Sequence, residues 1–360
     1  MSLPGGHERK CRGYAARDAS GHLTPFEFTR RALGPKDVYF RVYYCGICHT
    51  DLHQIRSEWN SSNYPMVPGH EIVGIVDEVG SEVSRFRPGD RVGVGSIVDS
   101  CRECDNCRRN EEQYCRKKKT FTYNDQDRDG NATYGGYSDY MVVSERYAFK
   151  MPENLPLEAA APLLVAGITA YSPMKYFQME SGGKNFGVVG LGGVGHMAVK
   201  FAKAMGMHVT VISTSPSKEE EAKKHLGADQ FLVSRDETQM RAAKGTLDFI
   251  IDTVSAPHPA DPYLDLLGPN GKFILVGVPP EPMQFYPRGV VAARKIIGGS
   301  LTGGTEETQE MLDFCGKHNV VCEIEKIKMD YVNTAMERLA KNDVRYRFVI
   351  DCENSFPVHH

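Results

Sequence analysis

Gly190-Leu-Gly-Gly-Val-Gly195 is the stretch of this 360-residue chain that decides its fold. It matches the pattern G-x-G-x-x-G, follows the apolar run Phe186-Gly-Val-Val189 and leads into a helix-like segment at 196–205. Glycines in this pattern allow a tight strand-to-helix turn and the close approach of a pyrophosphate to the helix N-terminus. The stretch therefore predicts a dinucleotide-binding Rossmann domain.

Strand-like and helix-like segments alternate around this turn, from about residue 184 to residue 300. Amphipathic segments such as 218–225 separate short buried runs. The expected strands are 185–189, 208–212, 231–233, 248–251 and 272–276. This alternation predicts an α/β fold with a doubly wound parallel sheet and right-handed crossovers.

The first half of the chain has a different pattern. Short β-branched runs broken by glycine and proline, at 38–44, 72–79 and 91–94, predict strands of a compact β-rich domain. The segment 159–171 has few turn signals and predicts a helix that crosses into the second domain. After about residue 303 mixed elements return, including a helix-like segment at 307–314.

The choice of cofactor depends on the residues after the second Rossmann strand. Sites for NAD usually carry an acidic residue there, which binds the ribose 2′-hydroxyl. This chain has Ser213-Thr-Ser-Pro-Ser-Lys218, where hydroxyls and one cation can bind a 2′-phosphate. An ordinary serine-capped loop is the alternative, but together with the upstream glycines the segment favours NADPH.

Composition excludes several classes of partner. The net charge of -3 gives no bias toward nucleic acid or an anionic membrane surface. No apolar stretch approaches the roughly 20 residues that cross a bilayer, and the N-terminus has no signal-peptide core. Four of the ten cysteines lie within fifteen residues, which indicates reduced thiols and a cytoplasmic protein.

Those four cysteines form the most specific local pattern in the sequence. Cys101, Cys104, Cys107 and Cys115 have the spacing of a closed, tetrahedral structural zinc site. We expect one structural zinc per chain, in a lobe at about residues 100–116. Such a site braces the fold and performs no chemistry.

Several longer blocks carry a resemblance to a known family. They are 44–51, 135–140, 211–217, 245–253, 333–339 and 343–351. Over nearly its whole length the chain resembles a plant cinnamyl-alcohol-dehydrogenase-type member of the medium-chain dehydrogenase/reductase superfamily. The resemblance implies a GroES-like β-rich catalytic domain (1–163 and 303–360), a Rossmann domain (164–302) that binds NADPH, and a homodimer joined through the Rossmann sheets.

The resemblance also implies which residues line the cofactor site. They are Thr169, Gly190, Leu191, Gly192, Gly193, Val194, Gly195, Ser213, Thr214, Ser215, Ser217, Lys218, Thr253, Gly277, Ser300, Leu301 and Thr302.

Catalytic residues are implied in the same way. Thr50 and His53 match the hydroxyl and imidazole that pass a proton between the substrate oxygen and solvent, with an ordinary surface histidine as the alternative for His53. Cys48 and His70 match two ligands of the catalytic zinc, and Glu71 is an adjacent carboxylate that can turn inward.

The third zinc ligand of the family is missing. The family has a cysteine where this chain has Val165, and valine cannot bind a metal. We therefore predict that the Cys48–His70 site is empty or only partly filled with zinc.

A weakened Lewis acid favours an acceptor that carries its own positive charge. We accordingly predict NADPH-dependent reduction of an iminium or α,β-unsaturated iminium, as in the branch of the family that acts on plant monoterpene indole alkaloids. The alternative is a cinnamyl or allylic alcohol dehydrogenase that reduces conjugated aldehydes with zinc on Cys48, His70 and Glu71. A nucleotide-binding protein without activity is a third possibility, which the intact glycine pattern disfavours.

Residues around the reacting carbon follow from the same resemblance. The expected pocket walls are Trp59, Tyr64, Phe121, Val165 and Leu301, with packing within their loop as the alternative for Trp59 and Tyr64. Available proton donors are Thr50, His53, Tyr64 and Glu71.

Overall fold

The computed structural model describes residues 8–180 and 182–356, and it divides into two compact units. Unit 1 comprises Met1–Val165 and Gly303–His360, and unit 2 comprises Ala166–Thr302. The first boundary falls two residues later than the sequence predicts, directly after Val165. Within the two described ranges, no helix is long and apolar enough to cross a bilayer.

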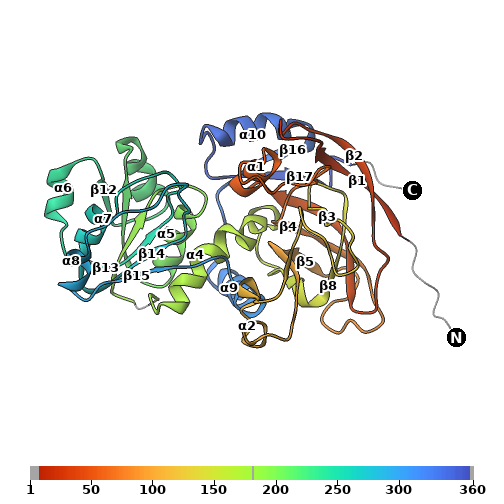
Figure 1. Ribbon diagram of the computed structural model, residues 1–360, viewed down its shortest axis with the longest axis horizontal. Helices are drawn as coiled ribbons and strands as arrows, with labels where there is room; N and C mark the ends of the chain where they lie inside the picture. The colour runs from red at the N-terminus through yellow and green to blue at the C-terminus, as the bar shows by residue number, and fades with distance from the viewer. Residues whose placement is uncertain (1–7, 181, 357–360) are drawn as a thin grey trace. The chain divides into compact units, whose positions relative to one another are not determined.

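Unit 2 is built on a six-stranded parallel sheet (Figure 1). Its strands are β10 (Asn185–Val189), β11 (His208–Ser213), β12 (Gln230–Val233), β13 (Leu247–Asp252), β14 (Leu267–Leu275) and β15 (Ile296–Gly299). Its helices are α4 (Ala166–Tyr176), α5 (Gly195–Ala204), α6 (Glu237–Ala242), α7 (Asp261–Leu266) and α8 (Pro287–Val291). The central strands are buried almost throughout because helices cover both faces of the sheet.

The order of these strands is β12-β11-β10-β13-β14-β15, with every neighbouring pair parallel. In chain order this is 3-2-1-4-5-6, the arrangement of dinucleotide-binding Rossmann domains. The predicted doubly wound sheet is therefore confirmed. The order reverses between β10 and β13, and ligands of such sheets bind beyond the carboxyl ends of the strands at this point.

Unit 1 is a β-rich domain with helices at its periphery. Its strands are β1 (Arg9–Ala16), β2 (Leu23–Arg30), β3 (Asp37–Gly46), β4 (Ile72–Val79), β5 (Arg91–Val94), β6 (Ile97–Ser100), β7 (Lys119–Phe121), β8 (Tyr140–Ser144), β9 (Phe149–Lys150), β16 (Ile324–Lys328) and β17 (Arg347–Asp351). Its α-helices are α1 (His49–Ile55), α2 (Asp105–Arg108), α3 (Leu157–Ala160), α9 (Thr305–His318) and α10 (Val332–Ala340). The 3-10 turns are η1 (Glu112–Tyr114), η2 (Glu145–Tyr147), η3 (Ala161–Leu164) and η6 (Met329–Tyr331).

The main sheet of unit 1 joins strands from the first half of the chain to strands near its C-terminus. Its order is β16-β17-β3-β4-β5-β9, and β8 also pairs with β3. The C-terminal strand β17 runs antiparallel to β3, with Ile350 opposite Cys45. Phe40, Ile47 and Phe348 belong to the core beneath this sheet and are fully buried. This pairing brings the C-terminal segment next to the residues that precede α1.

Two expected helices differ from the structure. The segment 159–171 is not one helix, because η3 ends at Leu164 and α4 begins at Ala166. Val165 lies between them with φ -130° and ψ -60°, which is outside the helical region. The segment 218–225 forms a 3-10 turn, η4 (Pro216–Lys218), and a π-helical turn, η5 (Glu221–His225).

Candidate functional site

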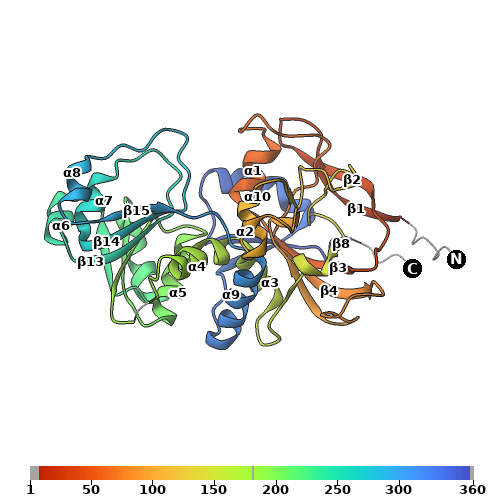
Figure 2. The same ribbon diagram turned by 60° about the horizontal axis from the view of Figure 1, so that its bottom comes forward.

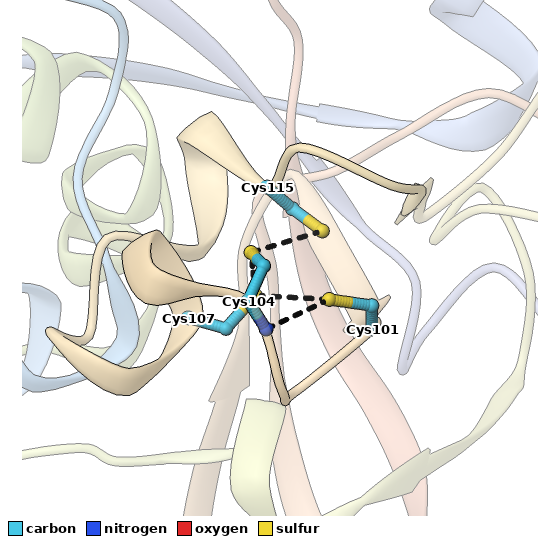
Figure 3. Close-up of side chains that lie close together, drawn as sticks. All are labelled: Cys101, Cys104, Cys107 and Cys115. Carbon is cyan, nitrogen blue, oxygen red and sulfur yellow. Dashed lines mark hydrogen bonds between the residues drawn. The ribbon is translucent and has the colours of Figure 1, made fainter.

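The four-cysteine lobe forms a compact sulfur cluster in unit 1 (Figure 3). The Sγ–Sγ distances are 3.8 Å between Cys101 and Cys107, 3.5 Å between Cys104 and Cys107, and 4.0 Å between Cys104 and Cys115. A tetrahedral zinc with Zn–S bonds of about 2.3 Å sets its sulfurs about 3.8 Å apart. The cluster therefore has the donor set and the dimensions of a structural zinc site.

Backbone hydrogen bonds favour the thiolate form of Cys104, whereas burial raises the pKa of Cys107. Backbone amides of Arg116 and Cys107 lower the pKa of Cys104 to about 6. The Cys104 amide donates to Cys101 Sγ at 3.4 Å. Ser100 Oγ lies 3.2 Å from Cys107 Sγ.

The lobe is also attached to the start of α9 (Figure 2). The buried carboxylate of Glu112 accepts hydrogen bonds from the Thr305 amide at 3.1 Å and the Thr305 hydroxyl at 3.0 Å. Arg146 donates to the same carboxylate at 2.9 Å. The chain re-enters unit 1 at Gly303, and α9 begins at Thr305. The hydrogen bonds to Glu112 therefore attach the four-cysteine lobe to the first residues after the chain re-enters unit 1.

The second cluster consists of Cys48, His70 and Glu71. Cys48 is the residue before α1, and His70 and Glu71 directly precede β4. One ligand atom from each lies within 4.8 Å of the others. His70 and Glu71 are buried, so their side chains face the interior of unit 1.

Asp51 orients His70 within this cluster. Its Oδ1 lies 3.2 Å from His70 Nδ1, and its Oδ2 accepts from the Cys48 amide at 2.8 Å and the Tyr137 hydroxyl at 3.2 Å. Burial disfavours the charged form of His70, but the Asp51 carboxylate raises the pKa of His70 well above its usual value. This arrangement leaves His70 Nε2 for a metal, as in carboxylate–histidine–metal sites.

The thiol of Cys48 is also prepared for metal binding. Burial alone would raise its pKa, but the hydrogen bond with His70 and the charge of Arg347 lower the pKa of Cys48 to about 7. A thiolate is the form that coordinates zinc.

Glu71 has one oxygen paired and one oxygen without a partner. Arg347 Nη2 contacts Glu71 Oε1 at 2.5 Å and donates to the Ile47 carbonyl at 2.8 Å. Glu71 Oε2 is buried and has no hydrogen-bond partner. A Cβ on Gly46 would lie 1.9 Å from this oxygen, so glycine is needed there to leave room for the carboxylate. Burial raises the pKa of Glu71 to about 8.

Together these residues fit a zinc ion. A thiolate, an imidazole nitrogen and a carboxylate oxygen are all zinc ligands, and three protein donors leave a fourth position for substrate. The unpartnered Glu71 Oε2 supplies the acceptor that such an ion would need. Val165 offers no donor atom and is not part of the cluster.

The expected relay residues lie on α1. Thr50 and His53 are three positions apart on the helix, which places them on one face. The His53 ring nitrogen Nδ1 contacts the Glu58 carboxylate, and its ring lies 5.2 Å from the Trp59 ring. The Tyr64 hydroxyl donates to the Ile55 carbonyl at 2.8 Å, so its proton is engaged in that bond.

The glycine-rich turn in unit 2 has the geometry of a phosphate site. A Cβ on Gly195 would lie 2.1 Å from the Gly190 carbonyl oxygen, so the close turn requires glycine. At Gly192 no atom lies within 4 Å of that position, which leaves space for a ligand. Thr253 Oγ1 donates to the Val189 carbonyl at 2.9 Å and ties the end of β13 to this turn.

The proposed 2′-phosphate segment lies beside the same turn. Lys218 Nζ donates to the Leu191 carbonyl at 2.8 Å, and the Ser215 amide donates to Ser213 Oγ at 3.2 Å. Thr214 and Ser217 belong to this segment, and both are exposed. No carboxylate occurs between Ser213 and Lys218.

Other expected cofactor residues follow the ends of neighbouring strands. Gly277 comes two residues after β14, and Ser300, Leu301 and Thr302 follow β15 directly. Thr302 has a left-handed backbone with φ 43°, unusual for a β-branched residue. Gly193 and Val194 complete the glycine-rich turn, and Thr169 lies in the first turn of α4.

Three of the five expected pocket residues are exposed in their own units, and Tyr64 and Val165 are partly buried. Trp59 is 53% exposed and Phe121 is 43% exposed in unit 1, while Leu301 is 51% exposed in unit 2. Large apolar side chains with this exposure are available to contact a ligand.

Sequence reasoning missed three residues of the site: Asp51, Glu58 and Arg347. Asp51 follows Cys48 by three residues, and that spacing was a usable signal for a partner of the metal site. Arg347 is separated from Glu71 by 276 positions, so only the pairing of β17 with β3 could reveal it.

The fold and these two clusters define a zinc-binding dehydrogenase. A model of the alcohol dehydrogenase GroES-like domain matches residues 34–153, and a model of the zinc-binding dehydrogenase matches residues 193–317. The chain is 59% identical over 358 residues to a probable mannitol dehydrogenase of Fragaria ananassa, covering 99% of each chain. It is 59% identical over 349 residues to the 8-hydroxygeraniol dehydrogenase of Catharanthus roseus, covering 97% of each.

Solved structures agree with these relatives. A cinnamyl alcohol dehydrogenase of Sorghum bicolor is 53% identical, with a TM-score of 0.94 over 98% of this chain and 100% of that one. A CAD of Helicobacter pylori complexed with NADP(H) is 41% identical, with a TM-score of 0.90 over 97% of this chain and 100% of that one. The chain belongs to the plant cinnamyl- and mannitol-dehydrogenase-type alcohol dehydrogenases of the medium-chain dehydrogenase/reductase superfamily, and it is an oxidoreductase of that family.

These comparisons change the balance between the two predicted reactions. The names of the relatives describe dehydrogenases of alcohols, which favours the alcohol dehydrogenase alternative. The predicted iminium-reductase branch has no support among them.

Proposed function

We propose that this protein is an NADP(H)-dependent alcohol dehydrogenase that interconverts primary allylic or cinnamyl-type alcohols and their aldehydes. The observation that carries the proposal is the Cys48–His70–Glu71 cluster, in which His70 and Glu71 are buried and Glu71 Oε2 lacks a hydrogen-bond partner. Glu71 takes the place of the missing cysteine ligand. Relatives named for 8-hydroxygeraniol and cinnamyl alcohol support the class of substrate.

Zinc on this cluster would act as a Lewis acid and stabilise negative charge on the substrate oxygen. Asp51 keeps His70 in the orientation that presents Nε2. Arg347 holds Glu71 through Oε1 and leaves Oε2 without a hydrogen-bond partner. These two contacts orient the donor groups before any substrate binds.

Oxidation of an alcohol releases one hydride and one proton. NADP⁺, when bound at the glycine-rich turn of unit 2, would supply the hydride acceptor, and Thr50 and His53 would carry the proton from the substrate oxygen to solvent. Glu58 accepts a hydrogen bond from His53 at the exposed end of α1. Aldehyde reduction uses the same path in reverse.

The preference for NADPH follows from the loop after β11. Its hydroxyls and Lys218 can bind a 2′-phosphate, while an acidic residue that would repel this group is absent between Ser213 and Lys218. The NADP(H) complex of the Helicobacter pylori relative supports this choice.

Iminium reduction is the second candidate, and Val165 is the observation that favours it. A carboxylate from a buried ion pair is a poorer zinc ligand than a thiolate that has no other partner. If zinc binds weakly, an acceptor with its own positive charge loses less than a neutral aldehyde.

Zinc analysis combined with activity assays distinguishes the two candidates. The proposal expects about two zinc ions per chain, one in each cluster, and reduction of coniferaldehyde that a chelator abolishes. About one zinc per chain, with chelator-resistant reduction of an alkaloid iminium and no aldehyde reduction, would reject it in favour of the second candidate.

We also propose that two copies of the chain associate through the edge of the Rossmann sheet. Strand β15 ends the sheet, and Ile296 on it and Val291 on α8 are 44% and 78% exposed. A second copy could extend the sheet and cover these side chains. We expect the parent protein to sediment as a dimer and the Val291→Asp variant to sediment as a monomer. A parent protein that sediments as a monomer would reject the proposed dimer.

A further inference from the structure

The loop that follows α1 is fastened by an amide side chain from a distant part of unit 1. Asn124 Oδ1 accepts a hydrogen bond from the Asn63 amide at 2.8 Å. Asn124 Nδ2 donates to Gln54 Oε1 at 2.7 Å and to the Ser61 carbonyl at 3.2 Å. One side chain thus joins the last turn of α1 to the far end of the loop.

Asn124 is itself held in a fixed position. Its backbone is left-handed with φ 56°, a conformation that asparagine tolerates better than most residues. The preceding ring, Tyr123, is buried and stacks on His70, with centroids 5.5 Å apart and planes 11° apart. The Thr122 amide donates to the Ser96 carbonyl at 3.0 Å. We call the hydrogen bonds of the Asn124 side chain to Gln54, Ser61 and Asn63 the clasp. The clasp is therefore anchored beside His70.

The fastened loop carries the partners of His53. Its residues 57–63 include Glu58, whose carboxylate contacts His53 Nδ1, and Trp59, whose ring contacts the His53 ring. The loop is tightly folded, since Ser57 and Asn60 both have φ 53°. Movement of the loop would displace both groups from His53 together.

We propose that Asn124 is a positioning residue that holds loop 57–63 so that Glu58 stays against His53. An amide suits this place because its Oδ1 accepts from both nitrogens of Asn63, and its Nδ2 donates two hydrogen bonds. Aspartate could supply only the acceptor, and glycine could supply neither. The effect on catalysis rests on the proposed function, in which His53 carries the proton.

Loop position can be measured without any assay of activity. Trp59 is the only tryptophan in the chain, so its fluorescence reports on this loop alone. In Asn124→Gly, which permits the left-handed backbone but removes the clasp, we expect stronger quenching of Trp59 by acrylamide. Gln54→Ala removes one end of the clasp and should act in the same direction.

Asn131→Ala is the matched control for this measurement. Asn131 lies on the same loop as Asn124, and its side chain contacts Asp127. Its replacement should leave the quenching unchanged. If Asn124→Gly and Gln54→Ala also leave it unchanged, the clasp does not hold the loop and the proposal is overturned.

Kinetics test whether the clasp acts through His53. Asn124→Gly should lower kcat about tenfold, as expected when a catalytic group is misplaced, with the KM for NADPH unchanged. Asn124→Asp, which keeps the acceptor for Asn63, should restore part of kcat. In a His53→Gln background, Asn124→Gly should cause no further fall.

The outcomes separate this proposal from the proposed function. If His53→Gln keeps full activity, the relay is wrong, and the quenching still decides whether Asn124 holds the loop. If His53→Gln loses activity but Asn124→Gly increases the quenching of Trp59 without lowering kcat, the positioning role is overturned.

Discussion

The Arg347 guanidinium pairs with Glu71 across 2.5 Å, and both side chains are almost completely buried. Arg347 comes from the last strand of the chain and Glu71 from the residue before β4. The pair neutralises a charge that would be costly in the interior of unit 1. It also leaves the second oxygen of Glu71 buried beside Gly46 without a hydrogen-bond partner.

Replacement of Arg347 by methionine should destabilise the protein strongly. Methionine fills similar space but leaves Glu71 buried without a counter-charge, which typically costs about 3–5 kcal/mol. The measurement is the free energy of unfolding in urea. Arg87→Met is the control, because its side chain is 86% exposed and such replacements change stability by less than about 0.5 kcal/mol. Equal stability of the two variants would show that the buried pair contributes little.

Replacement of Glu71 by glutamine should remove zinc from one site only. The neutral amide is a much weaker ligand than a carboxylate, so zinc content should fall from about two ions per chain to about one. Metal analysis after dialysis measures this, with the exposed Glu82→Gln as control. Val165→Cys should have the opposite effect and make the second zinc resistant to chelators. Unchanged zinc content in Glu71→Gln would exclude Glu71 as a ligand.

Replacement of Ser213 by aspartate should reverse the preference for cofactor. A carboxylate at the end of β11 repels a 2′-phosphate but can bind a ribose 2′-hydroxyl. Loss of charge-assisted contacts of about 1.5–3 kcal/mol should lower kcat/KM for NADPH by about 10- to 100-fold. The same variant should use NADH better than the parent protein. Ser213→Ala, which adds no charge, should lower kcat/KM for NADPH less than Ser213→Asp does. Equal effects of the two changes would show that charge at residue 213 does not decide the cofactor.

The Rossmann unit could be predicted closely from the sequence because its signals are local. Gly195 must be glycine to pass the Gly190 carbonyl, and the strand-like runs on either side belong to a sheet buried on both faces. The four cysteines of the zinc lobe also lie within fifteen residues of each other. Short-range constraints of this kind leave a readable pattern.

The Cys48–His70–Glu71 cluster could be predicted only in part because its partners are distant in sequence. The pairing of β17 with β3 brings Arg347 to Glu71, and no local pattern records it. The break at Val165 was missed for a similar reason. Residues 159–171 have helical composition, but tertiary packing places a non-helical residue in the middle of them.

A buried pair at the end of β13 gives a prediction about pH. Burial raises the pKa of Asp252, although the Val254 amide and His258 oppose this shift. His258 Nε2 lies 2.8 Å from Asp252 Oδ2, and its Nδ1 lies 2.8 Å from the Ala256 carbonyl. Both ring nitrogens of His258 therefore face oxygen acceptors.

The sign of the resulting pH dependence follows from the raised pKa. A group whose pKa is higher in the folded state adds stability below its unfolded value, about 3.9 for aspartate, and loses that contribution as pH rises through the folded value. The parent protein should thus lose stability over this range relative to Asp252→Asn, which does not titrate. Urea unfolding at several pH values measures the difference, with the partly exposed Asp248→Asn as control. Identical pH dependence in the parent protein and Asp252→Asn would show that Asp252 does not hold a proton more tightly in the folded state.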